Sequence, residues 1–145
     1  MIKLIACIDS EFGIGLKGKM PWPTLYADMK YFRRCTLGGT VVVGRKTFDE
    51  IGGLPERETI IYRGQKQKII DLASWKDVWI IGGGEVYMEF IPIADEIHLT
   101  RILGESYNCD AFFPAWNPIP EYICENYGFY NEGGISFVIE RYVKL

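Results

Sequence analysis

Short apolar runs alternate along the first two-thirds of the chain with stretches that have helical spacing of apolar residues. The runs are typical of strands buried in a sheet and lie at 2–8, 41–43, 58–63, 78–81 and 96–103. Helical spacing, with glycine or proline stops, predicts helices over about 24–36, near 47, over 68–74 and over 85–90. Residues 122–130 and 135–143 flank Asn131-Glu132-Gly133-Gly134, which predicts an antiparallel hairpin. The pattern therefore predicts an α/β sandwich with a mostly parallel sheet and antiparallel edge strands.

Length and charge narrow the class of protein. A chain of 145 residues without repeats or linkers predicts one domain over 1–145. The net charge of −3 argues against a nucleic-acid binder, and no apolar stretch is long enough to span a bilayer. The first residues lack the basic region and cleavage site of a signal peptide. We expect a cytoplasmic protein, and a monomer because no apolar heptad or exposed edge pattern indicates association.

The cysteines and the single histidine are too dispersed to form a metal cluster. Cys7, Cys35, Cys109 and Cys124 include no Cys-x-x-Cys pair, so we expect four reduced thiols and no metal site. His98 alternates with Ile97 and Leu99. A Cys–His nucleophile pair is one interpretation of this histidine. The favoured one is a polar residue on the less buried face of a strand.

Asp28 is the first candidate for chemistry. At 100° per residue, Leu25, Met29, Phe32 and Thr36 form the apolar stripe of the first helix, and Asp28 lies on its shoulder. A carboxylate that faces an apolar surface requires a partner. One interpretation is a structural ion pair at the rim. The other is a ligand-facing carboxylate that accepts two parallel hydrogen bonds from an amidine-like group on a heterocycle.

Two glycine turns follow buried strands and precede helices, as phosphate sites do. They are Gly44-Arg45-Lys46-Thr47 and Gly82-Gly83-Gly84, and Arg63 ends the strand beside the first of them. The sequence around them is neither a dinucleotide fingerprint nor a P-loop. Three cations near two amide-rich turns favour a ligand with several phosphates, such as a dinucleotide. Taken singly, each turn fits helix–strand packing and each cation a solvated surface.

Taken together, these residues resemble the dihydrofolate reductase family over almost the whole chain. The first motifs are Leu4-Ile5-Ala6-Cys7, Gly13-Ile14-Gly15, Met20-Pro21-Trp22 and Asp28. The later ones are Val43 to Phe48, Leu54-Pro55-x-Arg57, Ile80 to Gly84 with Tyr87, His98-Leu99-Thr100 and Asp110 to Pro114. The resemblance implies a three-layer fold with helices on both faces of the sheet. It also implies NADPH-dependent reduction of 7,8-dihydrofolate and binding of antifolate inhibitors.

The resemblance assigns the catalytic and substrate-binding residues. Asp28 would pair with N3–H and the 2-amino group of the pterin, Thr100 would support it, and Trp22 would hold an ordered water. Arg57 would grip the substrate's α-carboxylate with two bonds. The pocket would be completed by Ile5, Met29, Phe32, Ile51, Leu54 and Ile81.

The cofactor residues are assigned in the same way. Ala6 and Ile14 would frame the nicotinamide, and Met20 lies in the loop that closes over it. Arg63 would recognise the 2′-phosphate, which favours NADPH over NADH. The remaining cofactor contacts would come from Gly44, Arg45, Lys46, Thr47, Tyr62, Ile81, Gly82, Gly83, Gly84, Glu85, Val86 and Tyr87.

The mechanism expected from the resemblance is hydride transfer to pterin C6 with protonation of N5. Asp28 would act by polarising the ring and through water. Two alternatives remain open: a reductase of another pterin or a pyrimidine on the same fold, and a non-catalytic nucleotide-binding module.

Overall fold

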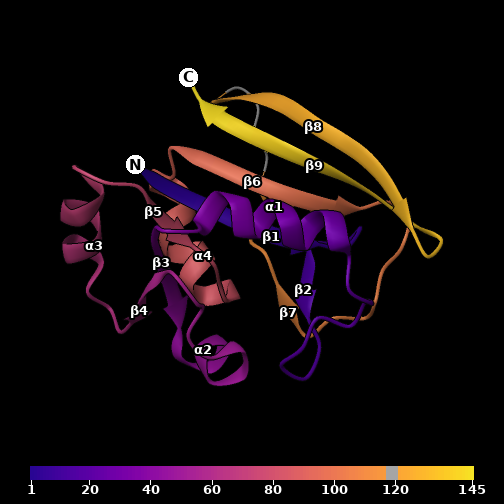
Figure 1. The fold of residues 1–145 in the computed structure, drawn as a ribbon, viewed down its shortest axis with the longest axis horizontal. Coiled ribbons are helices and arrows are strands. Elements are labelled where there is room, and N and C mark those ends of the chain that lie inside the picture. Colours follow the sequence, from indigo (N-terminus) through magenta and orange to yellow (C-terminus); the bar gives the residue numbers. More distant parts are fainter. Residues whose placement is uncertain (117–120) are drawn as a thin grey trace.

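A seven-stranded sheet forms the centre of the molecule (Figure 1). The computed structural model describes residues 1–116 and 121–145. The strand order is β4 (Glu58–Tyr62), β3 (Thr40–Gly44), β5 (Val78–Ile80), β1 (Ile2–Ile8), β6 (Glu96–Ile102), β9 (Ile135–Lys144) and β8 (Tyr122–Glu132). Neighbours from β4 to β6 are parallel, whereas β9 and β8 run antiparallel at one edge. The predicted sheet is therefore confirmed.

Helices cover both faces of this sheet, as the resemblance implies. The helices are α1 (Tyr26–Thr36), α2 (Arg45–Ile51), α3 (Lys66–Ala73), α4 (Gly84–Phe90) and the short 3-10 helix η1 (Ile91–Ile93). Alternate residues of each strand face opposite sides. Ile5, Val41 and Trp79 pack with Tyr31 of α1. Their neighbours on the other face pack with α3 and α4.

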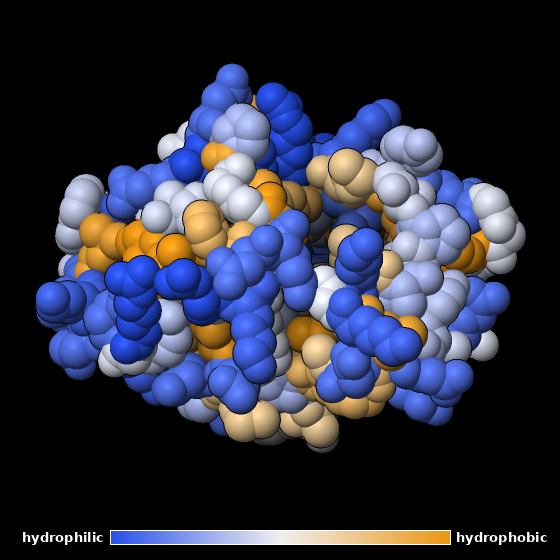
Figure 2. Space-filling model, turned by 90° about the horizontal axis from the view of Figure 1, so that it is seen from below, coloured by the Kyte–Doolittle hydropathy of each residue, from blue (hydrophilic) through white to orange (hydrophobic). Residues whose placement is uncertain are grey.

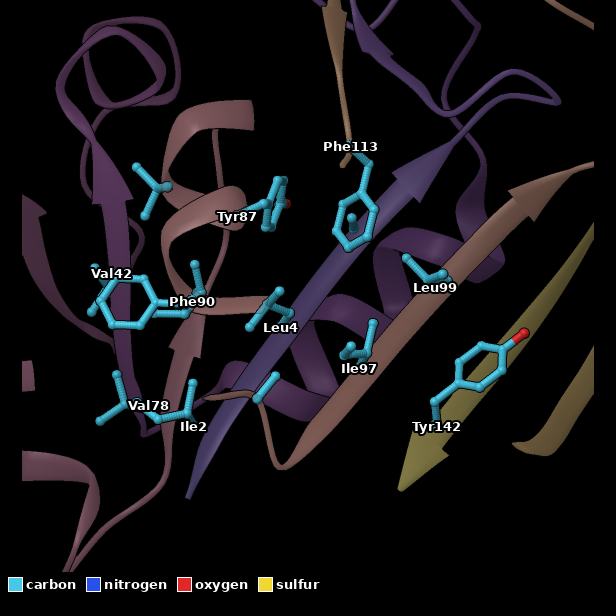
Figure 3. Packing of buried hydrophobic residues seen from close by; sticks show 14 of the residues in the cluster. Ile2, Leu4, Val42, Val78, Tyr87, Phe90, Ile97, Leu99, Phe113 and Tyr142 are labelled. Atoms are coloured by element: carbon cyan, nitrogen blue, oxygen red, sulfur yellow. The ribbon is translucent and has the colours of Figure 1, made fainter. Parts of the chain in front are cut away.

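The larger apolar cluster fills the space between the sheet and the α3–α4 layer (Figure 3). Leu4 of β1, Val42 of β3 and Ile97 of β6 point toward this layer, where Phe90 of α4 is fully buried. Strands covered on both faces show nearly continuous apolar runs. This burial explains why the strands of the first two-thirds were predictable from the sequence.

The C-terminal hairpin is longer than the sequence predicts. β8 and β9 extend to Glu132 and Ile135, so the connection is only Gly133-Gly134. Both glycines have positive φ, 57° and 83°, as the central residues of a type I′ turn require. Asn131 and Glu132, expected in the turn, are therefore the last residues of β8.

A second, two-stranded sheet is absent from the sequence-based expectation. β2 (Gly13–Gly15) pairs with β7 (Ala111–Phe112), and the sequence pattern predicts a strand at neither place. Asp9 is 3% exposed, and its carboxylate accepts hydrogen bonds from the backbone N–H groups of Glu11, Gly13 and Tyr107 at 2.7–3.0 Å. These bonds lower the pKa of Asp9 against the opposing effect of burial. A buried carboxylate thus fixes the start of the loop that carries Ile14.

No helix in the described part of the chain is long and apolar enough to cross a membrane. Cys7, Cys35, Cys109 and Cys124 are free thiols.

Candidate active site

Asp28 and Thr100 form the polar centre of the site. Asp28 lies in the first turn of α1, and Thr100 lies on β6, on the sheet face that α1 covers. The Thr100 hydroxyl donates a hydrogen bond of 2.6 Å to Asp28 Oδ1. Thr100 is only 3% exposed, while Asp28 is half-buried. The hydrogen bond therefore fixes the Asp28 carboxylate at a solvent-accessible edge of the core.

The environment of Asp28 favours its neutral form more than water does. Burial is the largest cause of a raised pKa, the negative charge of Glu132 adds to it, and the Thr100 hydrogen bond opposes both. No ion pair of the described residues includes Asp28. Asp28 is therefore suited to a ligand that donates hydrogen bonds, and the structural ion pair considered from sequence is not formed.

The predicted phase of α1 is wrong by part of a turn. Leu25 precedes the first helical residue, so its position does not follow the 100° spacing. Asp28 lies in the inward stripe with Tyr31, Phe32 and Thr36, whereas Met29 is 55% exposed. The carboxylate is consequently more central to the buried face than its predicted place on the shoulder.

The segment before α1 supplies a buried tryptophan and an exposed methionine. Trp22 is 6% exposed and packs edge-on against Tyr107, with ring centroids 5.5 Å apart. Met20 is 58% exposed. The loop that carries Met20 is attached to the β7 region, because Lys17 N donates to Asp110 Oδ2 at 3.1 Å. Trp22 is thus an anchor of this segment, and Met20 remains on the surface.

Arg57 is oriented by the C-terminal end of α1. Its Nη1 donates to Thr36 Oγ1 at 3.1 Å and its Nε to the Pro55 carbonyl oxygen at 2.9 Å. Asp28, Phe32 and Thr36 are spaced by four residues, so they lie along one face of the helix. Asp28 and Arg57 therefore mark the two ends of one helix face, with Phe32 between them. Leu54 and Ile81 are half-buried against the apolar cluster that contains Tyr31 of α1. Ile51 is 46% exposed at the end of α2.

The two glycine turns lie side by side. Gly44 N donates to the Gly82 carbonyl oxygen at 2.7 Å, which joins the carboxyl ends of β3 and β5. The bond between Gly82 and Gly83 is cis, and Gly82 has φ 127°, a conformation that L side chains rarely adopt. A Cβ on Gly83 would lie 3.0 Å from Thr47 Oγ1. Bare backbone from two turns thus forms one surface, with Thr47 beside it.

The predicted cations are exposed near these turns. Arg45 and Lys46 open α2 directly after Gly44, and Arg45 Nε lies 3.2 Å from Asp49 Oδ1. Arg63 follows β4, which is next to β3 in the sheet. The Arg63 side chain is exposed, as is Glu85 in the first turn of α4. The molecular surface seen from the α2 end mixes hydrophilic and apolar residues around a central hollow (Figure 2).

Several predicted cofactor residues are buried beneath this surface. Tyr87 is 4% exposed, and its hydroxyl donates to the Ile5 carbonyl oxygen at 2.7 Å. Val86 is 6% exposed. Tyr62 packs edge-on against Phe90 at 5.3 Å between ring centroids. Tyr87 packs beneath Gly82 and Val86 beneath Gly44, whereas Tyr62 is half-buried against Phe90 instead. Ile5 and Ala6 are buried on β1, and Ile14 is half-buried.

His98 lies on the polar and slightly less buried face of β6, as expected, but this face is buried as well. His98 is 5% exposed and belongs to a polar network under α1, because Glu96, His98 and Thr100 share one face of β6. His98 Nε2 lies 2.9 Å from Glu96 Oε1, and Nδ1 lies 2.5 Å from the Tyr31 hydroxyl. Burial lowers the pKa of His98, so the neutral ring donates to Glu96 and accepts from Tyr31. Polar residues at every second position of a buried strand were the available sign of this network.

Arg141 completes the network at the start of β6, where it binds Glu96. Its Nε and Nη2 donate to the two Glu96 oxygens at 2.9 and 3.0 Å. The hydrogen bonds from Arg141 and His98 hold the pKa of Glu96 at about 2, against the effect of burial. A surface cavity of about 290 Å³ opens beside these residues, away from Thr100. Because the charges here satisfy one another, we interpret the network as structural.

Glu96→Gln is expected to destabilise the fold by about 3 kcal/mol at neutral pH, since Arg141 would lose a buried partner. A lowered carboxyl pKa contributes stability above the unfolded value, and this contribution disappears as pH falls from about 4.5 toward 2. The variant should therefore show a flatter acid dependence. Urea unfolding at several pH values measures both effects. Glu58→Gln, at an exposed position, is the control, and parallel acid limbs in Glu96→Gln and wild type would refute this role.

Comparisons with known proteins agree on one family. Residues 1–128 match the family described as dihydrofolate reductase. A dihydrofolate reductase of Haemophilus influenzae is 36% identical over 118 aligned positions, which cover 72% of each chain. One of Bacillus subtilis is 33% identical over 132 positions, covering 81% of this chain and 77% of the relative. A solved structure of dihydrofolate reductase from Enterococcus faecalis, complexed with NADP(H) and RAB-propyl, superposes with TM-score 0.83 at 28% identity, covering 99% of this chain and 96% of that one.

Proposed function

Because the chain belongs to the dihydrofolate reductase family, and its activity is the NADPH-dependent reduction of 7,8-dihydrofolate to tetrahydrofolate, we propose that the reaction takes place beside Asp28. The observation that carries this assignment is the half-buried Asp28 carboxylate, held by Thr100 and free of any ion pair among the described residues. A carboxylate in this setting accepts two parallel hydrogen bonds from N3–H and the 2-amino group of a pterin.

The rest of the substrate follows the face of α1. Phe32 lies between Asp28 and Arg57 on this face, so the pterin and aminobenzoyl rings would contact it, with Ile51 and Leu54 as further walls. Arg57 would bind the α-carboxylate at the other end. Its guanidinium is already oriented by Thr36 and Pro55, which reduces the entropy lost on binding. An Arg at this place favours a folate over a pterin or pyrimidine without a carboxylate tail.

The residues of the two turns fit NADPH. The turns are joined by the hydrogen bond from Gly44 to Gly82, and the absence of a side chain at Gly83 would let a pyrophosphate approach the backbone there. Arg45, Lys46 and Thr47 would add charge and a hydroxyl, and Arg63 would meet the 2′-phosphate. Ala6, Ile14 and Met20 would surround the nicotinamide.

The chain's own residues orient the substrate and direct a proton. When bound, NADPH supplies the hydride that is transferred to pterin C6. Asp28 holds the pterin by its N3 and 2-amino edge and stabilises positive charge that develops on the ring. Since no other acid is assigned to the site, we propose that the N5 proton arrives through water that Asp28 polarises. Trp22 and Thr100 keep the carboxylate and this water in place.

The proposed function is tested by the oxidation of NADPH after dihydrofolate is added, with NADH in parallel. We expect turnover that requires dihydrofolate and favours NADPH. NADPH binding without turnover would favour the non-catalytic module, and turnover with another pterin or a pyrimidine alone would favour the other reductase.

Arg63→Ala should raise the Kd of NADPH by about 10- to 100-fold, since a hydrogen bond to a charged group contributes about 1.5–3 kcal/mol. The Kd of NADH, which lacks the 2′-phosphate, should hardly change. Fluorescence titration measures both constants, and Lys68→Ala removes an exposed cation from α3 as a control. Equal losses for the two nucleotides would exclude Arg63 from recognition of the 2′-phosphate.

We further propose that the enzyme acts in the cytoplasm as a monomer. The four free thiols suit a reducing compartment.

A further inference from the structure

The first turn of α1 is capped by a residue more than a hundred positions away. Leu25 at the N-cap provides no side-chain hydrogen bond. Instead, Glu132 at the end of β8 accepts hydrogen bonds from Tyr26 N at 2.7 Å and from Ala27 N at 3.0 Å, one with each carboxylate oxygen. First-turn N–H groups have no partner within the helix, so these bonds satisfy two of them.

This cap adjoins the residue assigned to substrate binding. Asp28 directly follows Ala27, so the Glu132 carboxylate fixes the two peptide units before it. A surface cavity of about 470 Å³ is lined by the hairpin tip and residues 23–26. Beneath it, Leu25 and Ile135 are buried in one apolar cluster. The Glu132 hydrogen bonds therefore fix the helix start, and the cluster keeps hairpin and helix together without them.

We propose, resting on the proposed function, that Glu132 is a positioning residue for dihydrofolate reduction. Glu132 holds the start of α1 so that Asp28 meets the pterin, and it places a second negative charge beside Asp28. A carboxylate at a helix N-terminus is itself stabilised by the helix dipole. The protein can therefore keep two carboxylates close together without a cation between them.

Glu132 is also the group that can set the electrostatics of Asp28. The titratable and polar groups that act on Asp28 are Cys7 of β1, Tyr87 of α4, Thr100 of β6 and Glu132 of β8. Burial raises the pKa of both Cys7 and Tyr87, so these two side chains are neutral near neutral pH. Among these groups, Glu132 is the one whose negative charge acts on Asp28.

The test compares Glu132→Gln with wild type. A glutamine oxygen can accept from one of the two N–H groups, but its NH2 cannot accept from the other. We expect the KM for dihydrofolate to rise about three- to tenfold, which corresponds to one lost hydrogen bond. The Kd of NADPH should not change. The apparent pKa in the pH profile of kcat/KM should shift downward by about half a unit, because a nearby negative charge is removed.

Two further variants separate position from charge. Glu132→Asp keeps the charge but shortens the reach, so we expect a raised KM with a smaller shift in the pH profile. Glu121→Gln removes an exposed charge just before β8 and should resemble wild type. A Glu132→Gln enzyme with wild-type KM and pH profile, or one that matches Glu121→Gln in both, would overturn the proposal. If Glu132→Gln does not fold, an unchanged KM in Glu132→Asp has the same consequence.

Titration of Asp28 by carboxyl 13C NMR, assigned with Asp28→Asn, provides a readout without turnover. A lower Asp28 pKa in Glu132→Gln supports the proposal, and an unchanged one contradicts it. If wild type does not reduce dihydrofolate, the proposed function fails, while this titration still decides whether Glu132 acts on Asp28.

Discussion

Asp28→Asn should lower kcat/KM for dihydrofolate by about 10²- to 10³-fold near neutral pH, the range found when a preorganised catalytic group is removed. The asparagine has the shape of aspartate but no charge, and its NH2 group faces a substrate donor. It therefore cannot accept two hydrogen bonds or stabilise positive charge on the ring. The loss should fall mainly on substrate turnover, since NADPH is assigned to the glycine turns. Steady-state kinetics and NADPH titration measure the two quantities.

Two controls support this prediction. Asp71→Asn makes the same change at an exposed position on α3 and should have wild-type activity. Thermal unfolding should show that Asp28→Asn is folded, because the substitution removes a partly buried charge without changing volume. An Asp28→Asn enzyme with wild-type turnover at neutral pH would remove Asp28 from the mechanism.

Arg57→Leu should raise the KM for dihydrofolate by about 30- to 100-fold with a smaller change in kcat. A bidentate charge-assisted contact contributes roughly 2–3 kcal/mol, and the α-carboxylate is remote from the reacting atoms, so the loss is mainly one of binding. A dihydropterin without the glutamate tail has nothing for Arg57 to hold. The KM for this second substrate should therefore be the same in the variant and in wild type.

Comparing the two substrates separates recognition from structural damage. Arg57 also bonds Thr36, so a destabilised variant would lose activity with both substrates. Arg33→Leu removes an exposed cation of α1, whose guanidinium lies 3.7 Å from Glu56, and should leave both KM values unchanged. Equal losses for both substrates in Arg57→Leu would assign Arg57 a structural role only.

The elements that a sequence predicts best are those decided by local pattern. β1 and β3 are buried on both faces, so their runs of apolar residues identify them directly. The glycine turns and Asp28 could also be identified from the sequence, because a glycine directly after a strand and a carboxylate in an apolar helix face each need a specific explanation. The family motifs then gave these residues an order and a function.

What the sequence did not predict depends on contacts between distant segments. The hydrogen bonds from the first turn of α1 to Glu132 join residues more than a hundred positions apart, and no local sequence pattern indicates them. The phase of α1 depends on the start of the helix, which tertiary contacts set, so Met29 was placed inward. β2 is only three residues long and forms because Asp9 and β7 hold it.

The most direct test of the account follows the hydrogen that is transferred. NADPH with deuterium at nicotinamide C4 is mixed with enzyme and 7,8-dihydrofolate, and the product is examined by mass spectrometry and NMR. With fully dideuterated cofactor, we expect one deuterium at C6 of tetrahydrofolate for each NADPH oxidised, and none at N5, which takes its proton from water. NADPH oxidation without deuterium at C6 would contradict hydride transfer at the Asp28 site.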